Sequence, residues 1–126
     1  MLHIQRPHTD PYFNLAAEEY LLRTVEEDGF MLWVNEPSVV VGKHQNAFAE
    51  VDRQYVKAKN IPVIRRITGG GTVFHDPGNL NFSFISKGEK DKLVDFRRFT
   101  QPVIDYLQGR GLSARFEGKN DIRIDG

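Results

Sequence analysis

Two arginines followed by three glycines are the part of this sequence with the most specific chemistry. Arg65 and Arg66 end an apolar run, and residues 69–71 are all glycine. Ordering consecutive glycines loses more backbone entropy than ordering other residues, so a folded domain that keeps three needs main chain without side chains there. Successive main-chain N–H groups bind phosphate, and guanidinium groups donate paired hydrogen bonds to phosphate oxygens. The segment predicts binding of a nucleotide or an acyl phosphate. The alternative is a tight strand–turn–strand connection with a surface arginine pair.

The composition excludes several other classes of function. The 126 residues include 17 basic and 17 acidic side chains, so the net charge favours neither a nucleic-acid nor a membrane partner, and any anion site must be local. The absence of cysteine removes disulfides, thiolate zinc sites and a cysteine nucleophile, and it fits a reducing compartment. The N-terminus lacks the apolar core of a signal peptide, and no segment has the length of a membrane-spanning helix. We expect a cytoplasmic protein.

The first helix is marked by Asp10 and Pro11, an N-cap followed by a residue suited to the first helical turn. It is expected to end near Val25. Its apolar stripe has a period of 3.6 residues, and we interpret the stripe as core rather than as a binding face. The stripe consists of Phe13, Ala17, Tyr20, Leu21 and Thr24.

Short strands and helices follow. Leu80, Phe82 and Phe84 alternate with polar residues, which predicts a half-buried strand with a polar face. A second amphipathic helix is expected to end at Gly109 as its C′ residue, and Pro102 either kinks this helix or marks its first turn. The other expected elements are strands 30–34, 39–41, 61–66, 72–75, 112–116 and 122–124, helical pieces within 47–59, a turn at 76–79 and a charged surface loop at 87–92.

Strands joined by short turns predict an α+β fold, with a mixed, mostly antiparallel sheet and helices packed on one side. The last two residues, 125–126, look like the turn of a hairpin whose second strand is absent. We therefore expect a fragment, truncated at residue 126, or one of two polypeptides.

The segment 65–79 closely resembles the lipoate–protein ligases of the A type, and segments 11–19, 41–46 and 118–121 agree with other motifs of that family in order and spacing. The resemblance covers nearly the whole chain. It implies a catalytic core like that of class II aminoacyl-tRNA synthetases and biotin ligases, with residues 1–126 as the N-terminal portion of a biotin/lipoate protein ligase catalytic domain.

The resemblance implies two half-reactions. (R)-lipoate and ATP, with Mg²⁺, form lipoyl-AMP, and the lipoyl group then passes to a lysine of an acceptor domain. The implied acceptors are the E2 subunits of 2-oxoacid dehydrogenases and the H protein of glycine cleavage, and a missing C-terminal portion or a second chain is a further implied partner. Two alternatives remain: an ATP-independent octanoyl or lipoyl transferase of the same fold, whose cysteine nucleophile is absent here, and a non-catalytic lipoate- or nucleotide-binding module.

The resemblance also implies roles for single residues. Arg66 matches the family's ATP-contacting arginine, whereas Arg65 assists it or faces the other side of the strand, because adjacent strand residues point oppositely. The residues implied at the lipoate pocket are His44, Gln45, Arg65 and Gly70. Those implied at ATP or lipoyl-AMP are Arg66, Gly70, Gly71, Thr72, Val73, Phe74, His75, Asn79 and Asp121.

Several of these residues have a structural alternative. His75 is either an acid–base group or a hydrogen-bonding or structural residue. Val73 is either ligand-facing or core, and Asn79 either caps the turn or bonds to the ligand. Asn46 is near the lipoyl pocket or caps the next helix. Asp121 is the best candidate for a Mg²⁺ ligand, unless it only shapes a turn.

Asn120 is a neutral oxygen donor beside Asp121. Lys119 lies inside the motif at 118–121 and does not match the family's essential lysine, which the resemblance implies just beyond that motif. We therefore expect the isolated stretch to adenylate poorly or not at all.

Overall fold

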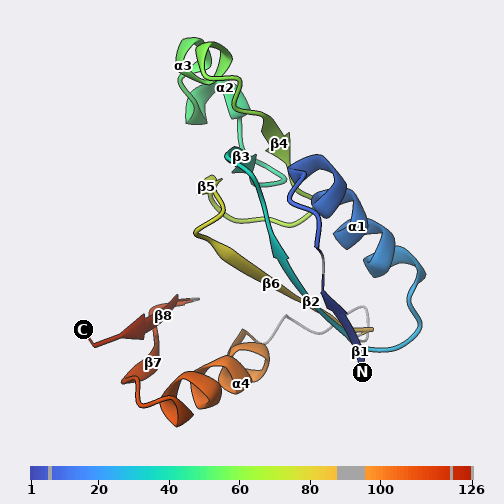
Figure 1. Cartoon of the computed structure of the whole chain (residues 1–126), viewed down its shortest axis with the longest axis vertical. Helices are drawn as coiled ribbons and strands as arrows, with labels where there is room; N and C mark the ends of the chain where they lie inside the picture. The colour runs from blue at the N-terminus through green and yellow to red at the C-terminus, as the bar shows by residue number, and fades with distance from the viewer. Residues whose placement is uncertain (6, 88–95, 120, 126) are drawn as a thin grey trace. The chain divides into compact units, whose positions relative to one another are not determined.

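The computed structural model describes residues 1–5, 7–87, 96–119 and 121–125 (Figure 1). The chain forms two compact units, Met1–Lys87 and Gly88–Gly126. Both mix helices with strands, which confirms the predicted α+β class. Within the described residues, no helix is long and apolar enough to cross a membrane. The elements are β1 (Leu2–Gln5), α1 (Pro11–Thr24), β2 (Gly29–Val34), β3 (Ser38–Val41), α2 (Ala47–Glu50), α3 (Arg53–Ala58), β4 (Val63–Arg65), β5 (Val73–His75), β6 (Leu80–Ile85), α4 (Phe96–Gly109), β7 (Ala114–Glu117) and β8 (Asp121–Ile124).

The first sheet of the N-terminal unit has the order β1-β2-β6. β1 runs parallel to β2, and β6 runs antiparallel to it. The sequence pattern did not predict β1, because four residues are too few for a clear alternation. The strand is held by pairing with β2 and by the main-chain bond from Leu2 N–H to the Asp28 carbonyl at 2.8 Å.

The second sheet has the order β4-β3-β5 and positions the glycine segment. β3 is parallel to β4, with Val41 opposite Arg65, and antiparallel to β5, with Ser38 opposite His75. β4 and β5 are therefore not neighbours, and the segment between them passes the carboxyl end of β3. The alternative of a tight strand–turn–strand connection is wrong for this reason. α2 and α3 form the crossover between β3 and β4 and lie beyond the ends of those strands (Figure 1).

The interpretation of the apolar stripe on α1 as core is wrong for Phe13, Tyr20 and Thr24, which are exposed, whereas Ala17 and Leu21 are half-buried. Pro11 and Asn14 are the buried residues of this helix, whereas Phe13 and Tyr20 are 51% and 66% exposed. Asp10 does cap the helix as predicted, with its carboxylate accepting from the N–H groups two and three residues later. Glu18, on the side of this helix that meets the first sheet, accepts a hydrogen bond from the Ser83 hydroxyl on β6.

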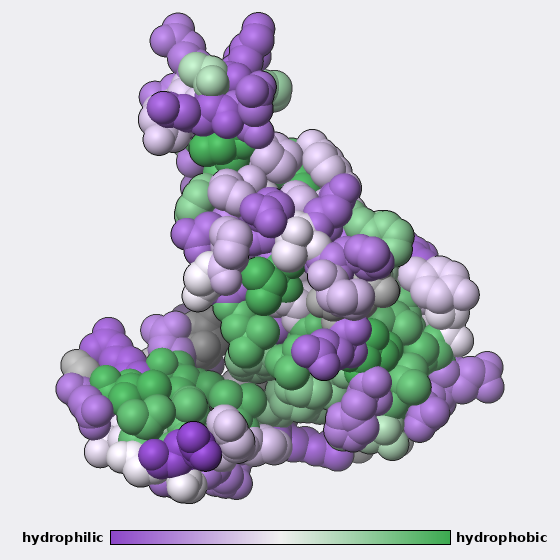
Figure 2. Space-filling model, in the orientation of Figure 1, coloured by the Kyte–Doolittle hydropathy of each residue, from purple (hydrophilic) through white to green (hydrophobic). Residues whose placement is uncertain are grey.

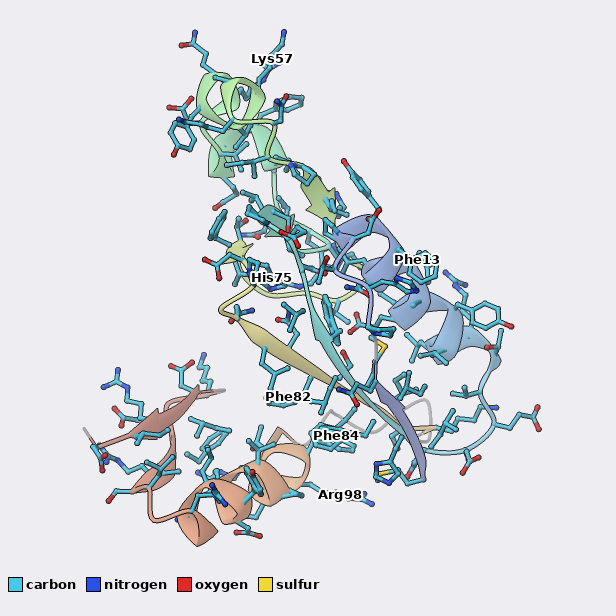
Figure 3. All side chains as sticks on the ribbon, in the orientation of Figure 1. Phe13, Lys57, His75, Phe82, Phe84 and Arg98 are labelled. Atoms are coloured by element: carbon cyan, nitrogen blue, oxygen red, sulfur yellow. The ribbon has the colours of Figure 1, made fainter. Side chains whose placement is uncertain are left out.

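The two faces of β6 are also reversed relative to the prediction. Ser83 lies opposite Met31 in the register and faces α1, and the Trp33 indole N–H donates to its hydroxyl at 3.0 Å. Phe82 and Phe84 point to the other side, where Phe82 is 40% exposed (Figure 3). Apolar side chains gather on this part of the surface (Figure 2). The face that carries Ser83 also carries the buried side chains of Met31, Trp33 and Ile85, so Ser83 is a hydrogen-bonded polar group within an otherwise apolar face.

The C-terminal unit consists of α4 and the antiparallel β7–β8 hairpin. Pro102 lies inside α4, and Ile104 is only 3% exposed. The prediction of Gly109 as the C′ residue is wrong, because the helix includes it and Gly111 has the positive φ of +86°. The N–H groups of Gly111 and Leu112 bond to the last-turn carbonyls in the pattern of a Schellman motif. Of the predicted charged loop at 87–92, all but Lys87 lies outside the described residues.

Candidate functional site

Two loops meet at the carboxyl end of β3. The first follows Gly42, and the second contains Gly69, Gly70 and Gly71. A Cβ atom placed on Gly42 would overlap the carbonyl oxygen of Gly70, so glycine is required there by the close approach of the two backbones. A main-chain hydrogen bond from Lys43 N–H to the Thr68 carbonyl, 2.9 Å long, joins the same loops.

A side-chain amide connects the two loops as well. Gln45 Oε1 accepts from the Gly42 N–H at 3.0 Å and from the Thr72 hydroxyl at 2.7 Å. His44 lies on the same loop and is exposed. Asn46 accepts from the Phe48 N–H and is the N-cap of α2. The helix-capping alternative for Asn46 is therefore confirmed, while Gln45 and Thr72 link the loops.

The side chains of Arg65, the last residue of β4, and of Arg66, which follows it, reach different loops, because adjacent residues of an extended chain point to opposite sides. Arg65 Nη1 donates to the carbonyl oxygens of Gly42, Lys43 and Gln45, at 3.0, 3.2 and 2.6 Å. The guanidinium thus folds the loop after β3 around itself. These hydrogen bonds fix the shape of the loop that contains His44 and Gln45, which the family resemblance implies at the lipoate pocket.

Arg66 organises the glycine loop in the same manner. Its Nε and Nη2 donate to the Gly69 carbonyl at 3.2 and 3.0 Å, and Nη2 donates to the Gly71 carbonyl at 2.7 Å. Gly70 has a φ of +104°, and a Cβ there would lie 2.7 Å from Arg66 Nη2. Within the described residues, nothing lies within 4 Å of a Cβ placed on Gly69 or Gly71. The loop thus consists of main chain without side chains that curves around the guanidinium group of Arg66, and the space beside Gly69 and Gly71 is open.

The strand after the glycines carries exposed apolar side chains. Val73 and Phe74 are 43% and 54% exposed, so the core alternative for Val73 is wrong. A pocket of about 190 Å³ lies between α1 and residues 64–67, which include both arginines. Its lining residues are Tyr12, Leu15, Ala16, Glu18, Glu19, Ile64, Arg65, Arg66 and Ile67.

His75 ends β5 inside a buried polar cluster (Figure 3). The ring is 7% exposed, and its Nδ1 lies 3.1 Å from Asn35 Nδ2. Trp33 contacts it edge-on, with the ring centroids 5.8 Å apart. Burial lowers the pKa of His75 below 6.5, and the positive charge of Arg66 lowers it further. The neutral imidazole is the stable form at neutral pH.

The cluster continues to Asn14, which the sequence analysis did not identify. Its Nδ2 donates to the carbonyls of His8 and Val34, at 2.9 and 3.0 Å, and to Asn35 Oδ1 at 3.0 Å. Both asparagines are completely buried. A usable signal was present, because Asn14 lies one helical turn from Pro11 and Glu18, on the face of α1 that meets the sheet.

Replacing Asn14 with alanine is expected to lower the free energy of unfolding by about 3 kcal/mol. The substitution leaves two main-chain carbonyls and the Asn35 amide without their donor in a buried place. Urea unfolding of the parent and the variant measures the difference. Asn46→Ala is the control, and it should lose only about 1 kcal/mol as an exposed N-cap; equal losses in the two variants would contradict the buried role of Asn14.

Stability should also depend on the protonation of His75. Because the pKa in the folded state is lowered from 6.5, the unfolded chain binds more protons just below that pH. The contribution of His75 is therefore fully present above pH 6.5 and is lost as the pH falls through the lower folded-state pKa. Unfolding free energies measured across this range should fall less steeply for His75→Gln than for the parent. Parallel curves would show that His75 has no such linkage.

The turn after β5 is formed as predicted. The Gly78 N–H donates to Asp76 Oδ1 at 2.8 Å, and the Asn79 N–H donates to the Asp76 carbonyl at 3.0 Å. The Asn79 side chain reaches forward and donates to Asn81 Oδ1 at 2.9 Å. Asn79 therefore belongs to the turn and to the start of β6.

Asp121 lies in the C-terminal unit, at the start of β8. It is exposed and pairs with Glu117 across the hairpin, and the turn before it uses Gly118 at a φ of +65°. Lys119 is exposed, and Asn120 lies outside the described residues. Across the ranges that the structure describes, no three His, Cys, Asp or Glu side chains gather into a metal-binding group.

Comparison with known proteins identifies the family. The lipoyl protein ligase A/B catalytic domain matches residues 10–126. Lipoate–protein ligase 1 of Staphylococcus aureus is 48% identical over 118 residues, which are 92% of this chain and 36% of that protein. The chain thus spans about a third of the length of this curated relative.

Two solved structures share the fold. The bipartite lipoate–protein ligase of Thermoplasma acidophilum, solved in a study of that ligase and its E2 lipoyl domain, is 33% identical with a TM-score of 0.87, over 98% of this chain and 51% of that one. A lipoate–protein ligase A bound with ATP is 31% identical with a TM-score of 0.84, over 96% and 52% of the two chains.

These matches agree with the α+β fold and with the glycine-containing loops described above. It belongs to the lipoyl protein ligase A/B catalytic domain family. The resemblance drawn from the segment at 65–79 is confirmed.

Proposed function

We propose that the protein is a lipoate–protein ligase. In the first step a carboxylate oxygen of lipoate attacks the α-phosphorus of ATP, the bond to the β-phosphate oxygen breaks, and pyrophosphate leaves with lipoyl-AMP as the product. In the second step the ε-amine of an acceptor lysine attacks the lipoyl carbonyl carbon. AMP leaves, a proton is lost from the amine, and an amide is formed.

The observation that carries this proposal is the bare glycine loop curved around Arg66, locked to the loop after β3. Adenylation brings two anions together, so it needs fixed positive charge and main-chain donors that are in place before reaction. Arg66 supplies the charge, and Gly70 and Gly71 supply main chain that a phosphate can approach closely. No described atom lies within 4 Å of the position that a Cβ atom would take on Gly69 or Gly71, so a ligand can approach the main chain there.

The acyl part of the ligand is proposed to lie along the exposed start of β5. Val73 and Phe74 offer apolar surface there, and Thr72 is held in place by Gln45. His44 belongs to the loop proposed to border the lipoate pocket, and Arg65 holds that loop from the end of β4. Asn79 is proposed to contact the ligand from the turn that follows β5.

Mg²⁺ is proposed as the partner of the nucleotide. Asp121 is proposed as a ligand of this ion, because it presents an exposed carboxylate and Mg²⁺ takes one or two carboxylates beside phosphate oxygens and water. When bound, the ion would neutralise charge on the leaving pyrophosphate. A chelator should therefore abolish adenylation without unfolding the protein.

The proposed acceptors are lipoyl domains, namely those of 2-oxoacid dehydrogenase E2 subunits and the H protein of glycine cleavage. The structural relative from Thermoplasma acidophilum was studied with its E2 lipoyl domain, which supports this class. That relative is bipartite, which also supports a contribution from further polypeptide, in the same chain or in a second one. A cytoplasmic location belongs to the proposal and agrees with a chain without cysteine.

Two assays on the polypeptide as its gene encodes it test the proposal. Lipoate-dependent exchange of pyrophosphate into ATP should be seen, and a purified E2 lipoyl domain should gain one lipoyl group, detected by mass spectrometry, only when ATP is present. Lipoylation from an acyl carrier protein without ATP would favour the transferase instead. Lipoate binding with no exchange and no transfer would favour a binding module.

A further inference from the structure

The hydrogen bonds of the buried cluster have a direction that can be read from their acceptors. Asn14 Nδ2 lies 2.9 and 3.0 Å from the main-chain carbonyls of His8 and Val34. A carbonyl oxygen only accepts hydrogen bonds, so the side-chain atom facing both must be the amide nitrogen. Reversing the Asn14 amide would place its oxygen against two other oxygens. The orientation of Asn14 therefore follows from the main chain.

The next bond follows from the first. An amide nitrogen donates but does not accept. The Asn35 atom 3.0 Å from Asn14 Nδ2 must consequently be its oxygen, and the Asn35 nitrogen is turned toward His75. Asn35 Nδ2 lies 3.1 Å from His75 Nδ1. Because this nitrogen carries only donors, Nδ1 has to accept.

We infer that Asn14 and Asn35 are positioning residues that hold His75 as the neutral imidazole with its proton on Nε2. The hydrogen bond made by one ring nitrogen decides where the proton of the other lies. His75 then presents an Nε2–H donor and has no basic nitrogen free on that side. In the proposed ligase reaction this ring can donate a hydrogen bond through Nε2 but cannot remove a proton.

The charge around His75 agrees with this assignment, whereas one buried oxygen of Asn14 is left unpaired by it. Protonation of Nδ1 would set an N–H group against the Asn35 N–H₂ group, and Arg66 adds a positive charge nearby, which is consistent with the lowered pKa of His75. Asn14 Oδ1 is buried and has no hydrogen-bond partner among the described residues. The amide keeps its orientation although this oxygen stays unpaired, since reversing it would remove three bonds.

Nitrogen-15 NMR of the histidine rings in the full polypeptide tests the inference directly. His75→Gln assigns the His75 signals by their loss. At neutral pH the Nε2 signal should be of the pyrrole type and the Nδ1 signal of the pyridine type, in the absence of any ligand. An Nδ1–H tautomer or an imidazolium signal for His75 would overturn the inference.

The near-isosteric variant Asn35→Asp reverses the polarity of the last bond. Its carboxylate accepts from Nδ1–H, so the NMR signature should change to the Nδ1–H tautomer or the imidazolium. If this variant does not fold, the parent spectrum alone decides. An unchanged spectrum in the folded variant would contradict the role of Asn35.

The role of His75 as a donor in catalysis rests on the proposed ligase activity, and a separate kinetic measurement tests it. His75→Phe should slow lipoate-dependent pyrophosphate exchange by about 10- to 100-fold, the loss expected for one hydrogen bond to a charged group. His75→Gln, which keeps an N–H donor, should retain more of the activity than His75→Phe. Equal rates for parent and His75→Phe would overturn the donor role. A parent without exchange but with the predicted tautomer would remove the ligase proposal and leave the assignment of the proton intact.

Discussion

Replacing Gly42 with alanine is expected to reduce adenylate formation about 100-fold and the free energy of unfolding by about 1–3 kcal/mol. The new methyl group would overlap the carbonyl oxygen of Gly70. That atom belongs to main chain and has no rotamer by which to move away. The loops would have to separate by about 1 Å, and displacements of that size at a reaction centre lower rates about 100-fold.

Gly109→Ala is the matched control for this substitution. Gly109 is the last residue of α4, and nothing described lies within 4 Å of a Cβ placed there. Its activity should equal that of the parent, and its stability should be equal or slightly higher, because alanine is the better helix residue. Adenylation rates come from pyrophosphate exchange, and stabilities come from urea unfolding. If Gly42→Ala behaves like Gly109→Ala, the two loops do not need their close approach.

Replacing Arg66 with alanine should lower the rate of adenylate formation by about 100- to 1000-fold, the loss found when one preorganised charge-stabilising donor is removed. The guanidinium has two functions in our proposal. It holds the carbonyls of Gly69 and Gly71, and it faces the anionic centre. Arg66→Lys keeps the charge but not the fork of donors, so it should recover only part of the rate.

Arg23→Ala is the control for the loss of an arginine. Arg23 is exposed on α1 and pairs with Glu19 at 2.9 Å, an interaction of a kind worth about 0.5 kcal/mol or less. Single-turnover formation of lipoyl-AMP should be unaffected in this variant. An unchanged rate in Arg66→Ala would remove the basis of the proposed anion site.

Local signals explain which parts of the fold were predictable. Asp10 and Pro11 mark the start of α1 because capping depends on neighbours two and three residues away. The two pieces of the 47–59 segment and the β7–β8 hairpin also follow from short-range patterns. The faces of α1 and β6 were misjudged because hydropathy alone was used to choose the inner side. In the structure, the inner side combines the buried Met31 and Ile85 with the hydrogen bonds that join Trp33, Ser83 and Glu18.

The candidate site was predictable in its residues but not in its construction. The glycine run and the arginine pair stand out by residue type, and the family resemblance added Gln45 and Thr72. The contact between Gly42 and Gly70 depends on the parallel pairing of β3 with β4, which no local pattern shows. Asn35 was not identified from the sequence. Its importance arises only when β2, β5 and α1 meet around His75.

The bonds that Arg65 makes to Gly42, Lys43 and Gln45 span 20 to 23 residues of sequence. They link the loop after β3 to the end of β4, so this loop cannot open while those bonds and the pairing of β3 with β4 persist. Amide hydrogens of this loop, such as that of Lys43, should therefore exchange with deuterium as slowly as amide hydrogens inside the sheet, and much more slowly than is usual for a surface loop. The loop would then already be ordered before an anion binds. Because the conformational entropy of the loop is lost during folding, anion binding would require little further ordering.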